Sequence, residues 1–219
     1  MFIKARIASY DGKKLVLLPE NDIARLLIRE NMDMAVIQLC DGRELSPLQR
    51  DKIYATIRDI ASWSGHAPEE LKEYLKFDFC KKDGRDMFSL SDVDMTTARE
   101  FISYLIDFCF RNAVPTKKSL IERTDDIGRY LYLCLEHRKC ALCNEKAEVH
   151  HVNRVGMGRD RERIVHEGLL AVALCRTHHS LAHAGERELF EKYHIHGIRL
   201  DKYLCKKLKL GTGGRKDDE

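Results

Sequence analysis

The strongest constraint on this chain is a window from residue 140 to residue 183 in which soft metal ligands are concentrated. It contains three of the eight cysteines and six of the ten histidines. Two ligand pairs, Cys140-x-x-Cys143 and Cys175-x-x-His178, each place two ligands on one side of a tight turn. Three cysteines and one histidine form a usual ligand set for structural zinc. The sequence therefore predicts a zinc site that ties the two turns together.

The remaining histidines of the window indicate a second site. They are the adjacent pair His150-His151, then His166, and finally His179-x-x-x-His183, whose spacing puts two imidazoles on one face of a helix. Neighbours on an extended segment point to opposite sides, so His150 and His151 can hardly bind the same ion. A neutral imidazole can activate a water molecule and a metal ion can neutralise developing negative charge, so such a site could carry out a hydrolysis.

The order of these motifs, CxxC, HH and CxxHHxxxH, resembles that of the HNH endonucleases over roughly residues 134–190. The resemblance implies a ββα-metal site that holds one catalytic divalent ion beside a zinc-stapled hairpin. It also implies that His150, His179 and His183 bind this ion and that His151 is the general base. More narrowly, the chain is similar to the HNH nucleases of bacteriophage recombination and replication modules.

One position departs from the family pattern. The family has an asparagine nine residues before the metal-binding histidine that opens the final helix, and here that residue is Leu170. Leucine cannot make the side-chain hydrogen bonds that orient the base. His166, four residues earlier, could take over this role if the loop is rearranged, or it could be an exposed loop histidine. We therefore expect either a different support for the catalytic geometry or a weak activity.

The segment between the two histidine motifs is rich in arginine. Residues 152–163 contain two glycines, which permit a tightly turned or mobile loop, and four arginines that could contact phosphates: Arg154, Arg159, Arg161 and Arg163. Up to Leu133 the chain has 21 basic and 22 acidic residues, and after it 17 and 13. This excess favours DNA contact over a merely solvated loop, but it is too small to prove a nucleic-acid partner.

The first 137 residues predict a small sheet followed by helices. Alternation over residues 3–7, the turn signal Asp11-Gly12 and the apolar run 15–18 predict a hairpin. Residues 22–30 have helical spacing, and residues 34–39 predict a third strand. Four further helices are expected: from Ser46-Pro47 to Gly65, from Pro68 to a polar loop at 81–85, from Asp94 through Phe108, and over residues 125–137. Shorter helices are expected over residues 186–193 and 200–210.

Segment 45–113 resembles the helical portion of the lambda NinB (Orf) recombination proteins. The resemblance rests on Gln49-Arg50, Ile60-Ala61, Gly65-His66, Glu70-Leu71 and Tyr74-Leu75. It implies binding of single-stranded DNA and action with the host single-strand-binding protein; the alternative is a helical packing module. Trp63, Tyr54 and Tyr74 could stack on bases, although such aromatics are more often core residues.

No apolar run approaches membrane-spanning length, and the first ten residues do not resemble a signal peptide. We therefore expect a cytoplasmic protein, in the host cytoplasm if a phage encodes it, with no membrane partner. Its cysteines should be reduced or metal-bound rather than disulfide-bonded. Five cysteines outside the window lie among apolar residues and are expected in the core: Cys40, Cys80, Cys109, Cys134 and Cys205.

Together these features predict an α+β chain with a small N-terminal sheet and helices, followed by a zinc-stapled ββα-metal domain. The expected division is a DNA- or partner-binding domain over residues 1–130, a nuclease domain over 131–210 and a flexible tail over 211–219. The expected activity is hydrolysis of DNA, single-stranded or branched forms included, in phage recombination or replication. Mg²⁺ or Mn²⁺ is the expected catalytic ion, with Ni²⁺ and Zn²⁺ as alternatives. A homodimer is one expected assembly.

A second function stays open at this point. The chain could be a zinc-stapled recombination accessory protein that binds single-stranded DNA and does not cleave it. Leu170 is the residue that keeps this alternative open.

Overall fold

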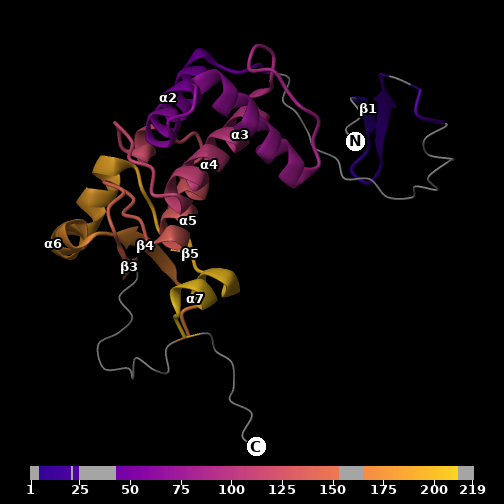
Figure 1. Cartoon of the computed structure of the whole chain (residues 1–219). Coiled ribbons are helices and arrows are strands. Elements are labelled where there is room, and N and C mark those ends of the chain that lie inside the picture. The colour runs from indigo at the N-terminus through magenta and orange to yellow at the C-terminus, as the bar shows by residue number, and fades with distance from the viewer. Residues whose placement is uncertain (1–4, 21, 25–42, 153–164, 212–219) are drawn as a thin grey trace, which may run out of the picture.

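The computed structural model of the chain describes residues 5–20, 22–24, 43–152 and 165–211 (Figure 1). These residues form two small antiparallel sheets and six α-helices, which is the mixed α+β class that the sequence predicts. None of the helices within these ranges is both long and apolar enough to cross a lipid bilayer.

The N-terminal hairpin consists of β1 (Ala5–Tyr10) and β2 (Leu15–Pro19), paired antiparallel as predicted. Its turn forms because the Asp11 carboxylate accepts hydrogen bonds from the backbone N–H groups of Lys13 and Lys14. Gly12 has a φ of 91°, which a side chain would disfavour. The helix expected over residues 22–30 is described only as far as residue 24, and the strand expected over 34–39 and Cys40 lie outside the described residues.

Helix α2 (Pro47–Ser64) begins and ends where the sequence predicts. Ser46 caps it by accepting from the backbone N–H of Gln49, and the Gln49 side chain accepts in return from the backbone N–H of Ser46. Gly65 ends it with a φ of 77°. The face that carries Ile53, Ile57 and Ile60 is fully buried, and this burial fixes the helix on the core.

Three further α-helices and a short 3₁₀ turn complete the N-terminal body: α3 (Pro68–Asp83), α4 (Met95–Arg111), η1 (Leu120–Glu122) and α5 (Ile127–His137). Asp94 caps α4 as predicted, accepting from the backbone N–H groups of Thr96 and Thr97. The polar loop expected over 81–85 was wrong: α3 continues through Asp83 and ends at Gly84, whose φ is 64°. Lys81 and Lys82 lie in the last turn of α3, where the negative end of the helix dipole favours cationic side chains.

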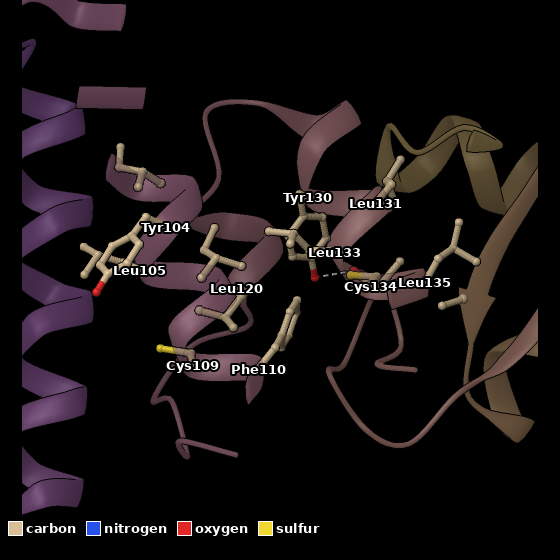
Figure 2. Close-up of a cluster of buried hydrophobic side chains, with 14 of the residues drawn as sticks. Tyr104, Leu105, Cys109, Phe110, Leu120, Tyr130, Leu131, Leu133, Cys134 and Leu135 are labelled. Atoms are coloured by element: carbon tan, nitrogen blue, oxygen red, sulfur yellow. Dashed lines mark hydrogen bonds between the residues drawn. The ribbon is translucent and has the colours of Figure 1, made fainter. Parts of the chain in front are cut away.

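Helix α5 joins this body to the ligand-rich region. The buried side chains between Leu45 and Leu208 form one cluster, part of which Figure 2 shows around α4 and α5. The Tyr130 hydroxyl on α5 donates to the carbonyl of Ala141 at 2.8 Å and accepts from the Asn144 amide at 2.9 Å, both in the first cysteine turn. Four of the cysteines expected in the core are buried, as predicted: Cys80, Cys109, Cys134 and Cys205.

The second sheet has the strand order β3 (Glu148–His151), β4 (Leu170–Leu174), β5 (Ile198–Arg199), with antiparallel neighbours. Helix α6 (Arg176–Tyr193) follows β4, and α7 (Lys202–Leu208) follows β5. Gly185 has non-helical backbone angles (φ −165°, ψ 76°) and divides α6 by a kink, so its second part agrees with the separate helix expected over residues 186–193. Strands β3 and β4 with α6 supply the two strands and helix of the expected ββα unit.

Candidate metal centres and active site

Cys140, Cys143, Cys175 and His178 lie together in the structure as one potential metal-binding group. The Nδ1 atom of His178 lies 3.4 Å from the Cys140 sulfur, 3.6 Å from that of Cys143 and 3.2 Å from that of Cys175. The sulfur atoms of Cys143 and Cys175 are 3.7 Å apart. Zinc bonds of about 2.3 Å to sulfur and 2.0–2.1 Å to nitrogen give tetrahedral edges of about 3.6 and 3.8 Å. The four side chains therefore fit a tetrahedral zinc ion.

Short backbone hydrogen bonds bring the two ligand pairs together. In the first turn, the N–H of Cys140 donates to the carbonyl of Glu145 at 2.7 Å, and the N–H of Asn144 donates back to Cys140 at 2.9 Å. The N–H of Ala141 donates to Ala173 on β4 at 2.9 Å. Since Cys175 follows β4 directly and caps α6, the first turn is held beside the second.

His150, His179 and His183 form a second potential metal-binding group, with one nitrogen from each within 4.8 Å of the others. The ring centroid of His150 lies 4.9 Å from that of His179 and 5.2 Å from that of His183. His150 comes from β3 and is 3% exposed, whereas the other two lie one turn apart on α6. Burial lowers the pKa of His179, which favours the neutral imidazole that a metal ion requires.

Two carboxylates contact ring nitrogens of these histidines. Glu186 Oε2 lies 2.6 Å from Nε2 of His150, and Glu148 Oε2 lies 3.3 Å from Nδ1 of His179. A carboxylate only accepts, so the proton of His150 lies on Nε2 and the lone pair on Nδ1. That Nδ1 atom is buried and has no hydrogen-bond partner among the described residues. A buried polar nitrogen without a partner destabilises the fold. A metal ion bound to Nδ1 would supply that partner, so this donor set fits a metal ion.

Neither Glu148 nor Glu186 was predicted from the sequence, although spacing could have identified Glu148. Glu148 precedes His150 by two residues on a strand, and alternate residues of a strand share one face. Glu186 follows the kink at Gly185, so helical spacing from His183 does not predict its contact with His150.

His151 lies on the other side of β3 from this group and contacts His166 instead. Its Nε2 is 2.9 Å from Nδ1 of His166. Burial lowers the pKa of His151, and the neighbouring His166 and His150 lower it further, so the ring is neutral at neutral pH. Burial also lowers the pKa of His166. Two neutral imidazoles can share one proton, with one ring donating and the other accepting.

Leu170 lies on β4, where it pairs with Arg199 of β5 and where its carbonyl accepts from the N–H of Val152 at 3.0 Å. Its side chain approaches Gly197 so closely that a Cβ on that glycine would come within 2.9 Å of the Leu170 Cβ and 2.7 Å of Val152 Cγ2. Leu170 therefore makes an apolar contact between strands, and His166 makes the hydrogen bond to His151.

The predicted DNA-contacting residues can be compared with the structure only in part. Arg154, Arg159, Arg161 and Arg163 lie outside the described residues. Of the three aromatics considered for base stacking, Trp63 and Tyr74 are exposed, at 45% and 62%, whereas Tyr54 packs against the core.

Two strands and a helix around three histidines, beside a zinc-type ligand set, define a ββα-metal protein. A family model whose description reads "Putative HNHc nuclease" matches residues 18–211. Since this match covers most of the chain, the protein belongs to that family of HNH nucleases. No curated protein and no solved structure matches the chain.

Proposed function

We propose that the protein is a metal-dependent endonuclease that hydrolyses DNA phosphodiester bonds with water. The observation that carries this proposal is the opposed placement of two neighbouring histidines on β3. His150 faces His179 and His183, and His151 faces His166. A ligand set and a general base on opposite sides of one strand provide the two functions that phosphodiester hydrolysis requires.

In this proposal His150, His179 and His183 hold the catalytic ion. A bound divalent ion supplies Lewis-acid stabilisation of negative charge on the phosphate and the leaving oxygen. Mg²⁺ and Mn²⁺ are the first candidates, and the imidazole ligands also suit Ni²⁺ and Zn²⁺. Glu186 and Glu148 keep two of the three rings oriented, since a carboxylate that accepts from the outer ring nitrogen fixes both tautomer and direction.

His151 is the general base. In the proposed tautomer, Nε2 of His151 carries the proton that is shared with Nδ1 of His166, which leaves the lone pair on Nδ1 of His151 free to take the proton of a water molecule. The depressed pKa keeps this imidazole in the neutral form that a base needs. His166 thereby performs the orienting role that the family assigns to the asparagine replaced by Leu170.

Cys140, Cys143, Cys175 and His178 hold a zinc ion that stabilises the fold and takes no part in hydrolysis. The site holds the turn after α5 against the start of α6, so it positions the strand and helix that carry the histidines. Because such sites do not exist in the unfolded chain, zinc binding energy becomes folding energy.

The biological process, location, domains and partners are proposed from the resemblances of the sequence. We place the activity in phage DNA recombination or replication, in the host cytoplasm, with a DNA-binding region over residues 1–130 and a nuclease region over 131–210. The host single-strand-binding protein and a second copy of the chain are the proposed protein partners. The arginines of residues 154–163 would contact DNA phosphates near the cleavage site.

The competing function is a zinc-stapled protein that binds DNA without cutting it. Leu170 favours it, because the side chain offers no hydrogen bond to the base. Incubation of supercoiled plasmid with purified protein in EDTA, Mg²⁺ or Mn²⁺ decides between them. Nicking that requires metal and disappears in His151→Ala supports the nuclease, whereas DNA binding without nicking in any metal supports the competing function.

A further inference from the structure

A cavity of about 220 Å³ opens between α2, α3 and the segment of residues 89–91, outside both metal-binding groups. Arg50 and Tyr54 of α2 line it on one side, and Lys72 and Lys76 of α3 on another. Figure 1 shows α3 on the far side of the helical body from β3 and α6. The cavity is therefore a separate feature of the molecule.

The charges around this cavity do not balance. Among the described residues that line it, Glu73 is the one acidic group, against the cations Arg50, Lys72 and Lys76. Glu73 forms ion pairs with both lysines: its Oε2 lies 2.9 Å from Nζ of Lys76, and its Oε1 lies 3.6 Å from Nζ of Lys72. Within the described part of the chain, the guanidinium of Arg50 makes no ion pair, and its side chain is exposed. Three positive charges and one negative charge leave an excess of two.

Lys76 is the unusual member of this group because its side chain is only 8% exposed. Its Nζ lies 5.5 Å from the ring centroid of Phe88, so the ammonium is held over an aromatic face. A buried ammonium is costly unless its donors are satisfied. Glu73 accepts one hydrogen bond from it and is itself largely exposed, so the ammonium retains donor capacity beside the cavity.

The third wall supplies neutral hydrogen-bonding groups. Ser89 and Ser91 are exposed, and their hydroxyl oxygens lie 2.8 Å apart. Hydroxyl donors together with Lys and Arg are the groups that proteins use on phosphate oxygens. Lys72 also lies 5.9 Å from the ring centroid of Tyr54, which forms the aromatic side of the cavity.

We propose that this cavity, which we call the α2–α3 pocket, binds a phosphodiester group of single-stranded DNA. The proposal rests on the proposed function in taking DNA as the ligand, and it adds a contact remote from the cleavage site. Arg50 and Lys72 bind the phosphate oxygens at the surface, and Lys76 supplies a fixed positive charge beneath them. Such a contact holds one part of a strand while another part lies at the histidines.

The test measures DNA binding without cleavage. Full-length zinc-bound protein carrying His151→Ala is titrated, with no added catalytic metal, into a fluorescently labelled single strand at several salt concentrations. In this background Arg50→Met with Lys72→Met should weaken binding roughly tenfold, as expected when charge-assisted hydrogen bonds are removed. The dependence of log affinity on log salt should also fall, by about 0.7 for each phosphate that is no longer bound.

Lys118→Met is the matched control, because Lys118 is 71% exposed and lies outside the pocket. It should leave affinity and salt dependence nearly unchanged. Lys76→Met alone should weaken binding too, and its thermal unfolding shows whether the fold is kept. If the Arg50 and Lys72 pair of substitutions binds DNA as its parent does, the proposal is wrong.

A competition experiment separates DNA from free phosphate. Inorganic phosphate at millimolar concentration should displace the labelled strand no better than sulfate at equal ionic strength. If phosphate occupies the pocket while the pocket substitutions leave DNA affinity unchanged, the site serves a small anion and the DNA proposal is overturned. Plasmid nicking by the wild-type protein is measured separately. If the wild-type protein binds the strand but does not nick plasmid, the result counts against the proposed nuclease and not against the pocket.

Discussion

Nε2 of His151 lies 2.9 Å from Nδ1 of His166, in a contact that links β3 to the residues before β4. Their ring centroids are 4.9 Å apart. The hydrogen bond gives the proposed base a fixed direction at a site where the family asparagine is absent. In the proposed mechanism His166 is a positioning residue, since it would act on hydrolysis through His151.

His166→Ala should lower the cleavage rate about tenfold, which corresponds to roughly 1.4 kcal/mol of transition-state stabilisation. The reason is that His151 loses the acceptor that selects its tautomer. His166→Gln offers an amide oxygen in its place and should recover part of the rate. Zinc content and DNA affinity should stay unchanged in both. Equal rates for the alanine and glutamine variants would show that the hydrogen bond does not position the base.

Glu186→Ala should weaken binding of the catalytic metal by about 10–100-fold, the usual effect of removing such a partner from a metal-binding histidine. Calorimetric titration of the zinc-bound protein with Mn²⁺ measures this without any reference to cleavage. Glu186→Gln keeps an acceptor for His150 Nε2 and should lose less. Glu188→Gln, an exposed neighbour on the same helix, is the control. Unchanged Mn²⁺ affinity in Glu186→Ala would contradict the orienting role.

Cys143→Ala should abolish stoichiometric zinc and unfold much of the region that follows α5. Zinc binding contributes about 10–16 kcal/mol in isolated zinc fingers, so loss of one ligand has a large effect on folding. Elemental analysis and thermal unfolding measure the two consequences. Cys80→Ala removes a buried cysteine outside the ligand set and should keep one zinc per chain. Freshly purified wild-type protein without zinc would rule out the site.

Replacement of Arg159, Arg161 and Arg163 by alanine should weaken binding to every DNA sequence alike. Phosphate contacts carry no sequence information, and removal of each one lowers the salt dependence by about one unit. Titrations of two unrelated DNA sequences at several salt concentrations measure both effects. An unchanged salt dependence would mean that these arginines only face solvent.

Much of the fold could be predicted because single residues determine where elements begin and end. Ser46 with Pro47 begins α2, Gly65 ends it, and Asp94 begins α4, and these are local backbone effects that a sequence displays directly. The error at residues 81–85 arose because a run of charged residues was interpreted as a loop. Here these residues follow a helix directly, and Lys81 and Lys82 belong to the last turn of α3.

The two groups of potential metal-binding residues could be predicted from spacing, whereas the contact of Glu186 with His150 depends on tertiary structure. Glu186 lies 36 positions from His150 in the sequence. His166, which the sequence offered either as a support for the base or as an exposed loop histidine, lies 15 positions from His151. Nothing in local periodicity states which ring nitrogen a distant side chain will meet. The close approach of Leu170 to Gly197, the residue before β5, likewise depends on the pairing of β4 with β5.

The central claim is that His151 is the base and that its neighbour His150 is a ligand. Substitution of each residue should therefore lower the cleavage rate in a different way. The decisive measurement is the rate of plasmid nicking by His151→Ala and His150→Ala across a range of Mn²⁺ concentrations. His151→Ala should be slower by about 10²–10⁴-fold at every concentration, because metal cannot replace a general base. His150→Ala should recover part of its rate as Mn²⁺ rises. Rescue of His151→Ala by metal without rescue of His150→Ala would reverse the assignment, and unchanged nicking in both would contradict it entirely.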